Sequence, residues 1–165
     1  MPGQSILYAP GYGYPGASTR PSHSTIEPVM LDSAKPFADN GLPGKKVDGK
    51  FVPLEEGDTA DVIYGIRVRS YPFMSDEDVS RQLSTPYNHT GDVMVRGYIA
   101  VKVNAGTPAE GGKVWVRVKG QTSDKPLGGF EAAADTTAGN TVELKIARFM
   151  GNADADGIAE IAFNI

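Results

Sequence analysis

The stretch from Gly91 to Gly120 alternates apolar and polar side chains with a period of two, and this constrains the fold most. Its first half places these apolar side chains on one face: Val93, Val95, Ile99, Val101 and Val103. Its second half sets Val114, Val116 and Val118 opposite Lys113, Trp115, Arg117 and Lys119. Successive side chains of a strand point to opposite sides of the sheet. We therefore expect two long strands, paired as a hairpin through the loop 104–112, with the rest of the sheet pairing around them.

Shorter segments predict further strands. Asp48-Gly49 is a strong signal for a tight hairpin turn, and it joins two short runs between Val47 and Leu54. Additional strands are expected at residues 62–70, 130–134, 142–146 and 158–165. The only helical pattern is Ser75 to Leu83, where three acidic residues fill the first turn.

The composition favours many turns over long helices. The 165 residues include 20 glycines, 12 prolines and no cysteine, so disulfides and thiolate metal sites are excluded. Short strands separated by turn signals indicate an all-β protein with an antiparallel β-sandwich or jelly-roll-like body.

The N-terminal residues differ from the rest of the chain. Residues 1–46 hold seven of the twelve prolines and three tyrosines, Tyr8, Tyr12 and Tyr14, set among glycines. Proline favours extended backbone, so we expect an extended arm at 1–46 and a β-sandwich domain at 47–165. Two alternatives stay open: the arm contacts a neighbouring subunit, or it is an irregular segment packed on its own domain.

Charge and motif content speak against several functions. The net charge of −4 offers no bulk attraction to nucleic acid, and we expect no membrane span and no signal peptide. The only two histidines, His23 and His89, lie in loop-like surroundings flanked by prolines, and no G-x-S-x-G motif occurs. We therefore expect no enzymatic activity and no cofactor.

Two local motifs are weak. Gly11 to Gly16 matches G-x-G-x-x-G, but prolines interrupt it and no helix follows, so we reject nucleotide binding. Asn152 to Gly157 resembles half of a calcium loop, although Phe163 stands where a bidentate glutamate belongs. A polar turn is the favoured interpretation, and weak calcium binding is the alternative.

Basic and aromatic side chains supply the candidates for partner contact. The cations of the 91–120 stretch either meet an acidic protein or form a solvated sheet face. The residues that we expect to contact a partner are Tyr8, Tyr12, Tyr14, Arg67, Arg69, Arg96, Trp115 and Arg117.

Several segments, in their order along the chain, resemble the structural cement or capsid decoration proteins of tailed bacteriophages. The likeness runs from about Ser24 to the C-terminus. These segments carry it: Ser24 to Pro28, Lys35 to Phe37, Val47 to Leu54, Gly57 to Ala60, Tyr64 to Pro72 and Asp154 to Ile161.

The resemblance implies a non-enzymatic virion protein on the outer surface of an icosahedral capsid, made in the host cytoplasm. Such a protein bridges neighbouring major capsid proteins as a small homo-oligomer, a dimer or trimer. We expect residues 1–20 to lie against another chain. The alternative function is a carbohydrate-binding β-sandwich module that stacks Trp115 and tyrosines on sugar rings; a β-rich hydrolase is least supported.

Overall fold

A computed structural model describes residues 11–69 and 88–165. Its strands are β1 (Thr25–Leu31), β2 (Pro43–Val47), β3 (Lys50–Pro53), β4 (Gly65–Arg67), β5 (His89–Ala105), β6 (Lys113–Arg117), β7 (Phe130–Glu131), β8 (Thr141–Phe149) and β9 (Ile158–Phe163). Two single 3₁₀ turns, η1 (Pro21–His23) and η2 (Ala60–Val62), are the only helical elements in these ranges. The predicted all-β body is confirmed, and the predicted helix at 75–83 lies outside the described residues.

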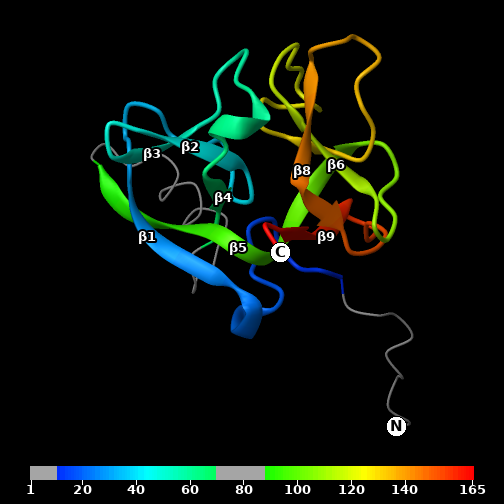
Figure 1. Cartoon of the computed structure of the whole chain (residues 1–165), viewed down its shortest axis with the longest axis horizontal. Coiled ribbons are helices and arrows are strands. Elements are labelled where there is room, and N and C mark those ends of the chain that lie inside the picture. Colours follow the sequence, from blue (N-terminus) through cyan, green and yellow to red (C-terminus); the bar gives the residue numbers. More distant parts are fainter. Residues whose placement is uncertain (1–10, 70–87) are drawn as a thin grey trace, which may run out of the picture.

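Strand β5 connects two lobes (Figure 1). Its first half pairs with β1, from Arg96–Thr25 to His89–Leu31, and with β4. Its second half pairs with β9, from Gly97–Phe163 to Lys102–Ile158, and with β7. Strands β1 to β4 lie in one lobe and β6, β8 and β9 in the other. The two sheets therefore share one strand, which gives a sandwich-like body. The pairings β1–β3 and β5–β7 are parallel and the others antiparallel, so the expected antiparallel order holds only in part.

The predicted hairpin of the 91–120 stretch is wrong in its pairing, although both strands exist. The two-residue strand β7 lies between β5 and β6, and β6 pairs with β7 and β8. Alternation of side chains specifies which face of a strand is buried, but not which strand lies beside it. The chain instead returns from the 118–129 loop to insert Phe130 next to Val103 and Val116.

The sequence predicted that the five apolar residues of β5 share one face, and this prediction is wrong. Thr25 pairs with Arg96 and Ile26 with Met94, so Val95 has no partner in β1 and forms a bulge. A bulge reverses the order of faces. Consequently Met94 packs in the same cluster as Ile99, while Val93 packs in a different one.

The larger of two hydrophobic clusters spans both lobes. It combines Ile63 and Ile66 from the β1–β4 lobe with Val116, Phe149 and Ile161 from the other. Burying such a side chain fully contributes about 1.5–3 kcal/mol relative to exposure. The shared cluster therefore binds the lobes into one body.

The smaller cluster lies under β1. It contains Val29, Leu31, Val93 and the stacked rings of Phe37 and Phe51, whose centroids are 5.0 Å apart. This cluster fixes β1 and the 37–51 segment on the first half of β5.

Two further predictions concern the first lobe. Asp48 and Gly49 have φ of 49° and 78° between paired Val47 and Lys50, which confirms the tight hairpin. The strand predicted at 62–70 is shorter, because Ala60–Val62 forms η2 and only Gly65–Arg67 pairs.

The range expected to be an arm, 1–46, contains β1 and most of β2, so this part of it belongs to the sheet. Within the described residues, no helix is long and apolar enough to cross a membrane.

Gly97 allows the strand to change sheets, and replacing it tests this. Its φ is +142°, and an added Cβ would lie 2.4 Å from the Ser24 hydroxyl oxygen. We expect Gly97→Ala to lower the free energy of unfolding by more than about 2 kcal/mol, because backbone strain and a steric clash add. Chemical denaturation measures it. The control is Gly139→Ala, where φ is +86° with nothing within 4 Å; equal losses in both variants would contradict the role of Gly97.

Candidate functional site

The N-terminal segment 11–20 lies along the second half of β5 of its own chain. Gly16 N donates to Ala100 O at 2.8 Å, and Ala100 N donates back to Ala17 O at 2.9 Å. Thr19 N donates to Tyr98 O at 3.1 Å. This matches the alternative in which the segment packs on its own domain, at least for residues 11–20. Tyr8 lies outside the described residues.

A buried carboxylate in β9 anchors this segment. Glu160 accepts hydrogen bonds from Thr19 Oγ1 at 2.5 Å and from Arg20 Nε and Nη2 at 3.0 and 2.8 Å. The hydrogen bond to Glu160 raises the pKa of Arg20, although burial partly opposes it. A two-point arginine–carboxylate contact fixes orientation as well as position. Sequence analysis missed Glu160, although a lone carboxylate within the apolar run 158–165 was a signal that it has a buried partner.

Asp154 holds the start of the described chain. Its Oδ2 accepts from Tyr12 N at 3.0 Å, and its Oδ1 accepts from Asp156 N and Ile158 N at 3.0 and 2.9 Å. Burial would raise the pKa of Asp154, but these backbone donors outweigh it and lower the pKa. The geometry is that of a polar turn, with the carboxylate engaged by N–H groups.

Two arginine–tyrosine contacts mark the surface formed by this segment. The Arg69 guanidinium carbon lies 4.0 Å from the ring centroid of Tyr14, and that of Arg20 lies 4.2 Å from Tyr98. Tyr14 is 61% exposed. Tyrosine and arginine are the residues that most often dominate binding energy at protein interfaces. We define the arginine–tyrosine surface as Tyr14, Arg20, Arg69 and Tyr98.

Two predicted contact residues are buried inside the chain. Arg67 and Arg117 are each 1% exposed, so neither can reach a partner in this fold. Arg67 projects into the small cluster, with its guanidinium 5.6 Å from the Phe37 ring, and its side-chain nitrogens have no hydrogen-bond partner in the described chain. Burial lowers the pKa of Arg67 to about 10, and the charge of Asp92 opposes that shift.

Arg117 instead forms a buried ionic network. Its Nε donates to Glu131 at 2.7 Å, its Nη2 donates to Asp135, and its Nη1 donates to the carbonyls of Lys119 and Gly120. Burial would lower the pKa of Arg117, but the contacts with both carboxylates outweigh it and raise the pKa. This network joins β6, β7 and the loop before β8.

The other predicted residues are separated from one another. Arg96 is exposed on β5, beside Thr25 of β1. Trp115 is half-buried on β6, paired with Glu131 and Glu143. Tyr12 is half-buried beside Asp154. Of the seven predicted residues that the structure describes, it therefore brings together only Tyr14 and Arg69.

Comparison with known proteins identifies related capsid components. The family model described as XM1 gp53 minor capsid protein matches residues 3–163. A chain in the structure titled "The capsid of Myoviridae Phage XM1" matches with a TM-score of 0.72 and 14% identity, covering 98% of this chain and 96% of that chain. At this identity the structural match shows a shared fold. No curated protein sequence matches the chain.

The Arg117 network makes stability sensitive to acid. The hydrogen bond from Arg117, followed by that from Thr137 N, lowers the pKa of Asp135 to about 2 from its ordinary 3.8. A lowered folded-state pKa stabilises the protein above pH 4, and this contribution is lost as the pH falls toward 2. We expect the melting temperature of Asp135→Asn to fall less than that of the unaltered protein across this range. The exposed loop variant Asp124→Asn is the control; parallel curves for all three proteins would contradict the prediction.

Proposed function

Because the chain belongs to the XM1 gp53 minor capsid protein family, and so has a structural role in a phage capsid, we propose that it cements the outer surface of the shell. In this proposal it bridges neighbouring major capsid proteins and carries out no chemical reaction. The arginine–tyrosine surface is the observation that supports a contact role, because it presents an aromatic ring and a stacked cation to solvent.

The anchoring of this surface suits it to binding. Tyr14 sits between two fixed points: Tyr12 is held by Asp154, and Thr19 and Arg20 are held by Glu160. A segment already ordered in the free protein loses little conformational entropy when a partner docks. The partner we infer is a flat, carboxylate-bearing patch of the major capsid protein, because guanidinium and phenol groups both donate hydrogen bonds.

Cementing follows from linkage rather than from catalysis. A protein that binds the assembled shell but not its separated subunits stabilises the shell by mass action. Many copies on one shell then add their contributions. The body must transmit force between its contacts, and the hydrophobic cluster shared by the two lobes gives it that rigidity.

Substitution of exposed Tyr14 and half-buried Arg69 tests the proposal. We expect Tyr14→Ala and Arg69→Met each to weaken binding to phage heads that lack this protein by about tenfold or more, as for interface residues of this type. Co-sedimentation with purified heads measures the binding. The control is Lys113→Met, which removes an exposed charge paired with Glu143 in the other lobe. Unchanged binding in both folded surface variants would refute the arginine–tyrosine surface as the contact.

A further inference from the structure

Strand β8 has partners at its two ends but not in its middle. On one side, β6 pairs with Glu143 and next with Arg148, so residues 144–147 of β8 have no partner in β6. On the other side the last β9 pairing is Phe163 with Ala147, followed by a single bond of 2.7 Å from Asn164 N to Ile146 O. No strand in the described ranges pairs with Leu144 or Lys145. The path of β9 along β8 therefore stops short of the first half of β8.

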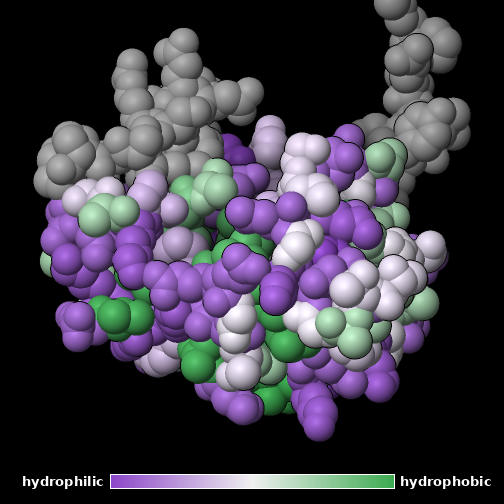
Figure 2. Space-filling model, turned by 90° about the horizontal axis from the view of Figure 1, so that it is seen from above, coloured by the Kyte–Doolittle hydropathy of each residue, from purple (hydrophilic) through white to green (hydrophobic). Residues whose placement is uncertain are grey.

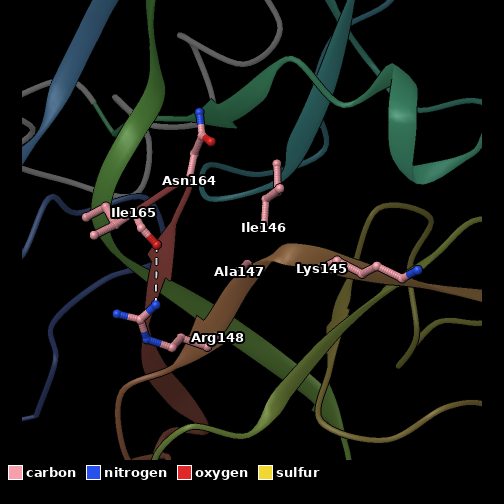
Figure 3. A pocket seen from close by; sticks show the side chains of 6 residues that line it. All are labelled: Lys145, Ile146, Ala147, Arg148, Asn164 and Ile165. Atoms are coloured by element: carbon pink, nitrogen blue, oxygen red, sulfur yellow. Dashed lines mark hydrogen bonds between the residues drawn. The ribbon is translucent and has the colours of Figure 1, made fainter.

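The space beyond the end of β9 is hollow. A cavity of about 440 Å³ lies between the η2 region, where Ala60, Asp61 and Ile63 line it, and residues 143–146 of β8. A second cavity of about 240 Å³ adjoins it, lined by residues 145–148 and by Asn164 and Ile165. Figure 3 shows Ile146 and Asn164 projecting toward the β1–β4 lobe, whereas Lys145 projects elsewhere. We call the first cavity, lined by Ala60, Asp61, Ile63 and residues 143–146, the β8–η2 slot.

Apolar side chains border the slot without being covered. Ile146, which lines both cavities, is 46% exposed, and Ile165, which lines the adjoining one, is 41% exposed. Val62 of η2, next to the lining residues Asp61 and Ile63, is also 41% exposed. The face that carries η2 and the start of β8 is seen in Figure 2, where apolar surface gathers in the middle between hydrophilic flanks. An uncovered strand edge beside exposed isoleucines is a site at which another strand adds readily.

We propose that residues 1–10 of a second copy of this chain occupy the β8–η2 slot as an added strand. These residues contain Ile6, Leu7 and Tyr8 in sequence and no charged side chain. Isoleucine and tyrosine favour strands. An uncharged strand suits a slot whose borders carry both signs, with Asp61 and Glu143 near Lys145.

The direction of the chain points to a neighbouring copy. From Arg20 back to Tyr12 the segment runs from Glu160 in β9 to Asp154 in the β8–β9 turn. The slot adjoins the opposite end of β9, beyond Phe163. The described segment therefore leads away from the slot of its own chain. Ten further residues extend at most about 35 Å, which is long enough for an added strand in a neighbouring copy.

Such a contact is head-to-tail, because the arm and the slot are different surfaces. Repetition of a head-to-tail contact gives a closed ring when the rotation between copies closes. Such a ring would be the homo-oligomer that contacts several capsid subunits in the proposed function. The inference rests on the proposed function for the role of the ring, whereas the experiments below test the ring itself.

Cysteine cross-linking tests the contact, since the chain has no native cysteine. The full chain carrying Ile6→Cys is mixed with the full chain carrying Ile146→Cys and oxidised. We expect a disulfide-linked heterodimer on a non-reducing gel. The matched control replaces Ile146→Cys by Ile26→Cys, an isoleucine that is 40% exposed on β1, and should give no such product. No heterodimer, or equal amounts with both partners, overturns the inference.

The oligomeric state provides the second measurement. Light scattering after gel filtration should show an oligomer for the full chain and a monomer for both the 1–10 deletion and Ile146→Glu, while Ile26→Glu stays oligomeric. Circular dichroism checks that each variant is folded. A monomeric full chain overturns the inference; if that monomer still co-sediments with phage heads, the proposed function stands without it. An oligomer that ignores the heads refutes the proposed function alone.

Discussion

The double pairing of β5 is the constraint on which the rest of the structure depends. One strand supplies hydrogen bonds to β1 and β4 through its first half and to β9 and β7 through its second. At the bulge at Val95, the apolar side chains of β5 change from one hydrophobic cluster to the other. Gly97 provides the positive φ at which the strand passes from one sheet to the next. Outside this strand the lobes meet through side-chain contacts and through backbone hydrogen bonds between loops, such as that from Gly57 N to Val118 O at 2.9 Å.

Ionic contacts of buried side chains join further segments of the body. Arg117 joins three segments of one lobe through Glu131 and Asp135, and Glu160 ties the N-terminal segment to β9. Breaking such a buried pair costs more than forming it contributes, because an unpaired charge remains inside. The contacts of Glu160 with Thr19 and Arg20 hold the N-terminal surface in a single arrangement, as a protein that works by binding requires.

Sequence patterns predicted local structure better than they predicted which strands and side chains lie next to each other. Val114 to Val118 alternates clearly enough to predict β6, and Asp48-Gly49 predicts its turn, because both signals lie within a few residues. The same alternation made Arg117 look solvent-facing, since its partners Glu131 and Asp135 are 14 and 18 residues away. Strand β7 has two residues and hence no period to detect. Among the predicted contact residues within the described ranges, only Tyr14 and Arg69 meet. They do so through a segment whose path along β5 no local pattern encodes.

Native-state hydrogen exchange of the β5 amides tests most directly whether this strand makes one body of the two lobes. If it does, core amides on both sides of Gly97, such as those of Val93 and Val101, exchange through the same global opening, with equal free energies that fall together in denaturant. Exchange of one half at a distinctly lower free energy would show that the lobes unfold independently, and would contradict the account.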